Sequence, residues 1–302
     1  MSMRDAGSVI ADADLVYVSD YFSFVGADER GRVAFAIDNN RGRDGDAYQA
    51  EHLYVVLHDE RRGWVNLAGV GRYENAKHAL LPIPDSPSFQ FIGDAATGLT
   101  IASAVNHLTL TIAPIVERVR RADDETLFSL GSTSAVLTWN GRAIHGRLIY
   151  EYLVRTGYNL MTRRSLKGLA EFQGLYLLAG GGDDLYAQSV RKQHGDGPFG
   201  LLGDRLGFFV RGGASEQLGE IHFAATKHAP AFGFYRWPTA WRVSWQGSNG
   251  PVSLNVRLST RKRIGNWFVA GFSMGVATGE LSSDDRTIPV YGLAELLMIA
   301  GR

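Results

Sequence analysis

Short runs of alternating, β-branched or aromatic residues, separated by polar turn-like clusters, follow one another along the whole chain. The clearest runs in the first third cover residues 15–25, 33–37, 51–57 and 64–70. A period of two is typical of β-strands, and clusters rich in Gly and Asp between the runs are typical of hairpin turns. Strands spaced this regularly predict an all-β chain built as barrels or sandwiches.

The later part of the chain has the same pattern. Further predicted strands cover residues 175–178, 206–210, 221–225, 240–245, 252–258 and 267–272. One long strand is predicted over residues 99–112, in which Ala102, Ala104 and Asn106 would share a face. Only residues 117–125 and 155–170 have a pattern that is helical or irregular.

An internal repeat divides the chain into two similar halves. Residues 128–153, FSLGSTSAVLTWNGRAIHGRLIYEYL, align without a gap to residues 272–297, FSMGVATGELSSDDRTIPVYGLAELL. Both copies are predicted hairpins, with turns at residues 139–141 and 283–285, and each closes one half. We therefore predict two β-barrel or sandwich domains related by internal duplication, residues 1–155 and residues 156–302.

Charge and composition narrow the class of protein. The 31 Lys and Arg residues balance the 31 Asp and Glu residues and are interspersed with them, which disfavours nucleic acid and anionic membranes as partners. The absence of cysteine excludes disulfides and thiolate metal sites. The N-terminus lacks the apolar core of a signal peptide, and no run is long enough to span a membrane. We predict a cytoplasmic protein without a transmembrane segment.

Several motifs resemble known sites but lack essential parts. Residues 271–275 match the serine-hydrolase pattern Gly-x-Ser-x-Gly, yet no histidine follows His228, so we predict an ordinary strand. The Gly-rich residues 180–185 and 195–207 lack the lysine and the helix of a phosphate loop. The loop before Glu51 only partly imitates a calcium loop, and the histidine spacings match no ligand set. We expect no cofactor and no metal.

Two repeated glutamates are candidates for buried carboxylates. Glu151 and Glu295 alternate with apolar residues, so a period of two would direct each of them to a barrel interior. An arginine stands nine residues before each of them, at Arg142 and Arg286. A duplicated structural ion pair is the preferred interpretation, because a buried carboxylate needs a partner.

Residues that break the repeat are better candidates for a functional site, since a ligand site is usually single. Glu51 is in phase with Leu53, Val55 and Leu57, which predicts an isolated carboxylate in an apolar pocket. The segment 228–237 has no counterpart in the first half and ends in Tyr235, Arg236 and Trp237. It is either an aromatic plug of the second barrel or a wall of a binding cleft.

The closing hairpins resemble a known superfamily. The resemblance rests on Gly-x-x-x-x-x-Leu, a polar turn and a final Glu-x-Leu in both copies, on Pro-Thr-Ala-Trp at 238–241, and on Ser-Asp-Tyr-Phe-Ser-Phe at 19–24. This pattern is similar to the two-domain lipocalin-like proteins that include AttH-type proteins, carotenoid hydratases and related cyclases. The resemblance implies two consecutive lipocalin-like (calycin) antiparallel barrels. The first strand has Tyr21-Phe22 where such families commonly have a tryptophan pair, and no family catalytic residue is matched.

The resemblance implies a cofactor-independent enzyme that binds an apolar isoprenoid or polyketide and hydrates or cyclises it at a C=C bond. Our candidate catalytic residues are Glu51, Asp20, Tyr21 and Asn106, and our candidate substrate-binding residues are Tyr235, Arg236, Trp237 and Trp241. The pocket is expected in a barrel or between the barrels. A non-catalytic carrier of a lipid or pigment is the alternative, and a structural interaction protein with filled barrels is a third possibility.

Overall fold

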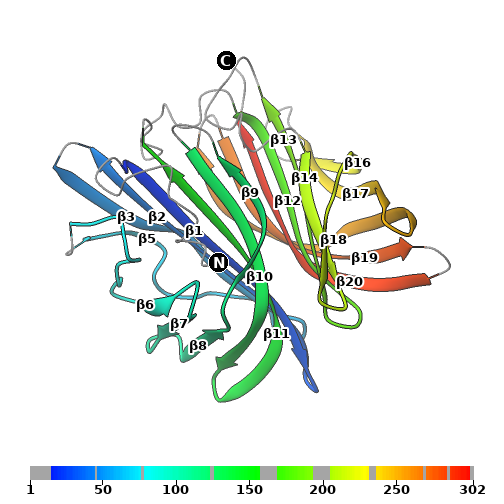
Figure 1. Ribbon diagram of the computed structural model, residues 1–302. Helices are drawn as coiled ribbons and strands as arrows, with labels where there is room; N and C mark the ends of the chain where they lie inside the picture. Colours follow the sequence, from blue (N-terminus) through cyan, green and yellow to red (C-terminus); the bar gives the residue numbers. More distant parts are fainter. Residues whose placement is uncertain are drawn as a thin grey trace. The chain divides into compact units, whose positions relative to one another are not determined.

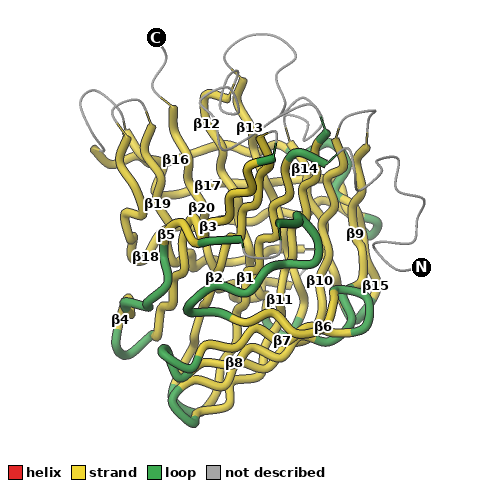
Figure 2. The backbone as a smooth tube through the Cα atoms, turned by 90° about the vertical axis from the view of Figure 1, so that its left-hand side faces the viewer, coloured by secondary structure: helices red, strands yellow, loops and turns green. Residues whose placement is uncertain are grey.

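The computed structural model describes residues 15–44, 46–75, 78–122, 126–156, 169–192, 205–230, 236–267, 270–283 and 286–299. These residues form strands and loops and contain no helix (Figure 2). The chain divides into two compact units, Met1–Lys167 and Gly168–Arg302. Each unit contains one antiparallel sheet that curls into a half-barrel (Figure 1). The predicted all-β fold class is therefore confirmed.

The sheet of the N-terminal unit has 11 strands in the order β4-β3-β2-β1-β11-β10-β8-β7-β6, with β5 paired to β3 and β9 paired to β10. Its strands are β1 (Tyr17–Asp28), β2 (Gly31–Asp44), β3 (Ala47–Asp59), β4 (Gly63–Val65), β5 (Gly71–Tyr73), β6 (Gln90–Asp94), β7 (Gly98–Ser103), β8 (Leu108–Ile112), β9 (Val116–Ala122), β10 (Thr126–Trp139) and β11 (Arg142–Arg155). The first strand pairs with the last, so neighbouring hairpins extend from a central β1-β11 pair.

The sheet of the C-terminal unit has nine strands in the order β15-β14-β13-β12-β20-β19-β18-β17-β16. Its strands are β12 (Leu169–Ala179), β13 (Asp183–Lys192), β14 (Arg205–Arg211), β15 (Ala214–Gln217), β16 (His222–Pro230), β17 (Arg236–Gly247), β18 (Gly250–Trp267), β19 (Ala270–Ser283) and β20 (Arg286–Ile299). Here too the first strand of the unit, β12, pairs with the last, β20. The two units thus share one topology.

The sequence repeat coincides with the two closing hairpins. In β10-β11, Phe128 pairs with Leu153, and in β19-β20 the equivalent Phe272 pairs with Leu297. The first hairpin turns at Asn140-Gly141, where both residues have positive φ angles of 49° and 74°. A two-residue turn of this kind matches the right-handed twist of the strands, and Asn-Gly is its preferred sequence. Residues 271–275 lie within β19, which confirms the prediction of an ordinary strand.

Two predicted elements of the N-terminal unit are wrong. The long strand predicted over residues 99–112 is the hairpin β7-β8, because residues 104–107 form a turn in which His107 has a φ angle of 48°. Asn and His tolerate this left-handed conformation better than β-branched residues do. Within residues 117–125, the structure has strand β9 up to Ala122 rather than a helix. In residues 99–112 the alternation of apolar and polar residues continues across the β7-β8 turn, so the sequence pattern does not reveal the turn.

Each unit has its own apolar core on one face of its sheet. In the N-terminal unit, the core includes Phe22, Phe35, Leu57, Leu137 and Ile144. In the C-terminal unit, the core includes Leu175, Trp237, Trp241, Leu254, Ala277, Ala294 and Leu296. We call the face that carries these side chains the inner face of each sheet. Side chains on the opposite face are one residue out of phase with them.

Gly279 keeps two strands of the C-terminal sheet close together. A Cβ atom at this position would lie 1.9 Å from the backbone oxygen of Asn255 on β18, and backbone atoms cannot move away cheaply. We expect Gly279→Ala to lower the free energy of unfolding by about 1–3 kcal/mol because it forces strands apart. Urea denaturation measures this loss. The control is Gly219→Ala, where a Cβ would meet no atom within 4 Å; an equal loss in both variants would contradict the close-packing explanation.

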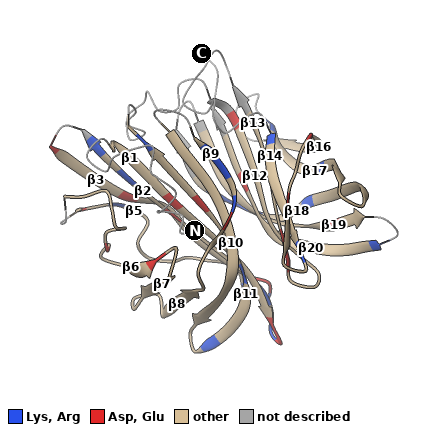
Figure 3. Cartoon of the chain, in the orientation of Figure 1, with Lys and Arg blue, Asp and Glu red and all other residues tan. Residues whose placement is uncertain are grey.

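Acidic and basic residues are interspersed along the strands of both units (Figure 3). This agrees with the balanced formal charge of the sequence. Among the described residues, no helix is long and apolar enough to cross a membrane.

Candidate functional site

A β-bulge in β3 decides which polar side chains face the core of the N-terminal unit. Val55 on β3 pairs with Ile37 on the inner face, and Tyr54 pairs with Asp38 on the opposite face. The next residue of β2, Asn39, pairs with His52 and not with Leu53. Leu53 is therefore an extra residue, and the alternation along β3 shifts by one position there. As a result, His52 and not Glu51 shares the inner face with Val55.

A buried ion pair lies on the inner face, next to the apolar core. Arg41 Nη2 donates to Asp20 Oδ2 at 2.5 Å, and both side chains are buried. The Tyr150 hydroxyl donates to the other oxygen of Asp20. Arg41 also donates through Nη1 to Asn39 Oδ1 at 2.6 Å and through Nε to the Leu80 carbonyl at 2.7 Å. Both charged groups thus have the hydrogen-bond partners that burial requires.

The same network continues to a neutral histidine. Asn39 Nδ2 donates to the Tyr73 hydroxyl at 2.6 Å and approaches His52 Nδ1 at 3.4 Å. His52 Nε2 lies 2.8 Å from Ser86 Oγ. Burial and the positive charge of Arg41 lower the pKa of His52 to about 4, so its ring is neutral at pH 7. An Asn donor at Nδ1 assigns the ring proton to Nε2, which then donates to Ser86.

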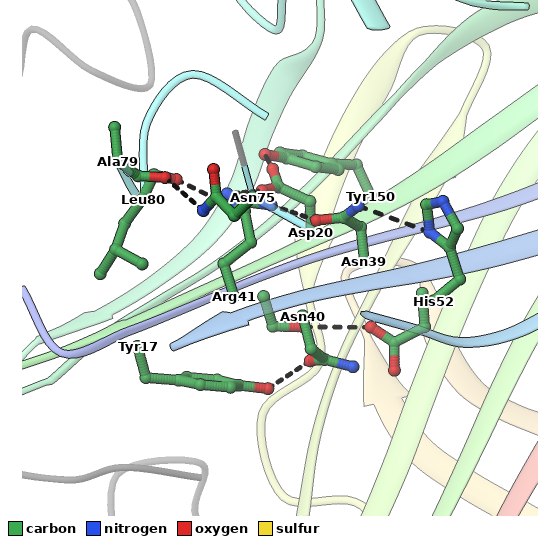
Figure 4. Close-up of polar contacts among 12 residues, drawn as sticks. Tyr17, Asp20, Asn39, Asn40, Arg41, His52, Asn75, Ala79, Leu80 and Tyr150 are labelled. Carbon is green, nitrogen blue, oxygen red and sulfur yellow. Dashed lines mark hydrogen bonds and ion pairs between the residues drawn. The ribbon is translucent and has the colours of Figure 1, made fainter. Parts of the chain in front are cut away.

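The opposite face of the same strands carries an acid with a raised pKa. Asp38 is buried, its Oδ1 accepts from Ser19 Oγ at 3.2 Å, and Asn40 also hydrogen-bonds to its carboxylate. The Tyr17 hydroxyl in turn donates to Asn40 Oδ1. Burial raises the pKa of Asp38 to about 7, against the lowering effect of these hydrogen bonds. Figure 4 shows Tyr17 and Asn40 on one side of the strands and Asp20, Arg41 and Tyr150 on the other.

Two further carboxylates share this face with Asp38. Glu51 on β3 and Glu151 on β11 both raise the pKa of Asp38 through like-charge repulsion. Burial also raises the pKa of Glu51, although Arg72, whose Nε lies 3.6 Å from Glu51 Oε2, opposes this shift. We call this side of β1, β2, β3 and β11, with Asp38, Glu51 and Glu151, the acid face.

Aromatic rings lie beside the acid. Tyr21 on β1 pairs in register with Asp38 on β2 and with Glu151 on β11. Tyr54 on β3, the other neighbour of β2, also pairs with Asp38. The two tyrosine rings meet edge to face, with centroids 5.8 Å apart. An electron-rich ring near a carboxylic acid can stabilise a positive charge that develops on a substrate.

The structure brings two of the four predicted catalytic residues together. Glu51 and Tyr21 lie on the acid face, whereas Asp20 lies on the inner face of the same sheet, next to Arg41. Asn106 lies in the β7-β8 turn, where its side chain accepts from Ala68 N at 2.8 Å and donates to Ala68 O at 3.1 Å. It therefore holds a loop and does not contact the other three residues.

The predicted substrate-binding residues belong to the C-terminal unit, and Tyr235 lies outside the described residues. Arg236 is exposed at the start of β17 and donates to the His228 carbonyl at 3.4 Å. Trp237 and Trp241 are buried in the core of this unit. Trp241 Nε1 also donates to Gln173 Oε1 at 2.5 Å.

The predicted ion pair between Arg142 and Glu151 is wrong. Nine residues along a strand span about 30 Å, so the two side chains lie at opposite ends of β11. Arg142 instead binds Asp28 and Asp59, at 2.5 Å each, and these bonds lower the pKa of Asp28 to about 2. Glu151 lies on the acid face and not toward the core as predicted, because Leu148, Tyr150 and Tyr152 are the inner residues of β11.

Sequence reasoning missed Asp38, whose pKa burial raises to about 7, and it found only Asp20 among the residues of the inner network. Asp38, Asn39, Asn40 and Arg41 stand within a loop-like polar run that predicted a turn, yet they all belong to β2. The available signal was that a polar run directly continues the apolar strand 33–37 without Gly or Pro between them. No group of three or more His, Asp or Glu side chains suited to a metal ion occurs within the described ranges.

Comparisons with known proteins identify the fold. No protein-family model matches the sequence, and no curated protein matches it significantly. Solved structures do match over nearly the whole chain. An AttH protein from Nitrosomonas europaea has a TM-score of 0.61 and 11% identity, with 98% of this chain and 96% of that chain covered.

Two further structures match at similar levels. Kievitone hydratase from Nectria haematococca has a TM-score of 0.59 and 10% identity, covering 99% of this chain and 96% of its own. CghA in complex with Sch210972 has a TM-score of 0.59 and 9% identity, covering 95% and 90%. The resemblance inferred from the closing hairpins is thus confirmed for the fold: the chain has the architecture shared by AttH, kievitone hydratase and CghA.

Proposed function

We propose that this protein is a cofactor-independent enzyme that protonates a C=C bond of an apolar isoprenoid or polyketide, leading to hydration or cyclisation. The observation that carries the proposal is the buried Asp38 carboxyl, whose pKa is raised to about 7 on a face with two more carboxylates. A general acid works best when its pKa lies near the working pH, because it is then both protonated and able to release the proton.

The chemistry follows from the groups on the acid face. Protonated Asp38 gives its proton to one alkene carbon, so that a C–H bond forms, the π bond breaks and Asp38 becomes a carboxylate. The neighbouring carbon becomes a cation, which the rings of Tyr21 and Tyr54 and the negative charges of Glu51 and Glu151 stabilise. No reductant, oxidant or bound cofactor is needed for this step.

The cation has two outcomes. In hydration, water forms a C–O bond with the cation and its surplus proton passes to a carboxylate such as Glu51. In cyclisation, a second double bond of the substrate attacks the cation, and loss of a proton to a carboxylate gives an isomer of unchanged mass. The presence of a hydratase among the structures of this fold supports the first outcome by analogy.

The test is to incubate the purified protein with a panel of linear isoprenoids and polyenes and to follow the products by mass spectrometry. A mass gain of one water indicates hydration, and an isomer with a new retention time indicates cyclisation. We expect Asp38→Asn to lower product formation by about a hundredfold, because the amide cannot donate a proton to carbon.

The matched control is Glu29→Gln, which removes an exposed carboxylate in the β1-β2 turn and should leave the product yield unchanged. Recovery of every substrate unchanged, together with tight binding of one of them, would refute the enzyme and favour the carrier. Full activity of Asp38→Asn would refute the role of Asp38.

A further inference from the structure

Two arginines lie side by side on the inner face of the C-terminal sheet. Arg261 and Arg263 are two residues apart on β18 and pair in register with Gly275 and Ser273 on β19. Both arginines are exposed. Within the described part of the chain, neither has a carboxylate partner. Two adjacent, unneutralised guanidinium groups favour binding of an anion.

A β-bulge places these arginines on the inner face. Leu258 packs against the core, and the following Ser259 is an extra residue between two register pairs of β18 and β19. The alternation of the strand therefore shifts by one, as it does at Leu53 in the N-terminal unit. Without the bulge, Lys262 would share the face of Leu258, and the two arginines would point the other way.

Arg261 is held over an aromatic ring of the core. Its guanidinium carbon lies 5.8 Å from the ring centroid of Trp237, a distance that suits a cation–π contact. Partial burial, and then the charge of Arg263, lower the pKa of Arg261. The repulsion between the two cations would be relieved by an anion between them. Trp237 therefore positions one cation at the edge of an apolar surface.

Ser273 provides an independent sign of a missing ligand. Its side chain projects from the inner face in the same row as Arg263 and the core residue Leu296. Ser273 is only 1% exposed, and its Oγ has no hydrogen-bond partner. A buried hydroxyl without a partner destabilises the fold, and a ligand acceptor would remove this cost.

The nearby polar side chains are engaged elsewhere. Gln173, which pairs with Leu296 in the same row, accepts from Trp241 and donates to Glu171 Oε1 at 2.5 Å. The hydroxyl of Ser273 and the two arginines therefore lie close together on the inner face. Their immediate surroundings, Leu258, Leu296 and Trp237, are apolar.

We propose that the C-terminal unit has a binding site for an amphipathic organic carboxylate. The carboxylate contacts Arg261 and Arg263 and accepts from Ser273, and the apolar part of the ligand packs beside Trp237. This site belongs to the C-terminal unit alone and does not depend on the role proposed for Asp38.

Titration of the full-length protein with dodecanoate, below its micelle concentration, tests the proposal by isothermal calorimetry. We expect Arg261→Gln and Arg263→Gln each to weaken binding about tenfold, since each removes a charge-assisted hydrogen bond to the carboxylate. Ser273→Ala should weaken binding severalfold. Dodecanol has the same alkyl chain but no charge. Its affinity for the wild type should be no higher than the affinity of the arginine variants for dodecanoate.

The control variant is Arg242→Gln, which removes an exposed arginine from the opposite face of the same sheet, where it donates to Asn255 Oδ1 at 3.2 Å. It should bind dodecanoate like the wild type. Absence of dodecanoate binding, equal binding of dodecanol, or an equal loss in Arg242→Gln would each overturn the site. Thermal melts confirm that the variants are folded.

Discussion

Arg41→Met should destabilise the N-terminal unit by about 3–5 kcal/mol, because removing one partner of a buried ion pair leaves the other charge uncompensated. Arg41 is fully buried and Asp20 is 3% exposed, so water cannot take the place of the guanidinium. The substitution also removes the donors to Asn39 and to the Leu80 carbonyl. Urea denaturation followed by circular dichroism measures the loss, and hydrogen exchange of β1 and β2 locates it.

Two further variants separate charge burial from loss of packing. Arg72→Met breaks an ion pair whose arginine side chain is 73% exposed, and it should cost less than about 1 kcal/mol. Combining Asp20→Asn with Arg41→Met removes both charges, so the double variant should be more stable than Arg41→Met alone. If Arg41→Met were as mild as Arg72→Met, the buried pair would not hold the strands together.

The fold was predictable because its signals are local or repeated. Alternation of apolar and polar residues located most strands, and the repeat at 128–153 and 272–297 identified two equivalent hairpins with the same register. The Asn140-Gly141 turn is encoded by the two residues that form it. These features need no knowledge of distant parts of the chain.

The site was harder to predict because it depends on single-residue shifts. At Leu53 and Ser259, one extra residue reverses which side chains face the core, and no residue type marks either position. The phase of Glu51 was therefore assigned to the wrong face. The alternation along a strand predicts which side chains face the core only up to the first bulge.

Residue type also gives no sign that Asp38 is buried. Asp38 and Asn40 stand in a run that is typical of a loop, and their burial comes from pairing with β1 and β3, which are formed by residues elsewhere in the sequence. A raised pKa is a property of that environment and not of the residue itself. Only the register of β1, β2 and β3 distinguishes Asp38 from the other acids of the chain.

The inner network and the acid face are connected through the backbone of β2. Residues 38 to 41 alternate between the two faces. Asn39 and Arg41 lie on the inner face and Asn40 lies on the acid face (Figure 4), where Asp38 also lies. The inner hydrogen bonds fix the backbone from which Asp38 projects. A rigid support of this kind keeps an acid in one orientation, which general acid catalysis requires.

Asp38→Asn should change the pH dependence of stability more than any other single substitution on the acid face. The pKa of Asp38 is raised from 3.8 to about 7, so between these pH values the folded state retains a proton that the unfolded chain has released. Stability from this group is fully present below about pH 4 and is lost as the pH rises through about 7. At pH 8 the buried carboxylate costs the wild type up to about 4 kcal/mol.

Asparagine cannot ionise, so the variant escapes this cost. We expect the free energy of unfolding of Asp38→Asn, relative to the wild type, to rise by up to about 4 kcal/mol between pH 4 and pH 8. Urea denaturation of both proteins across this range gives the difference, and Glu29→Gln is the control for loss of a carboxylate at an exposed position. Parallel pH profiles for the wild type and Asp38→Asn would show that Asp38 titrates at its ordinary pKa, and the general acid would then have to be sought elsewhere.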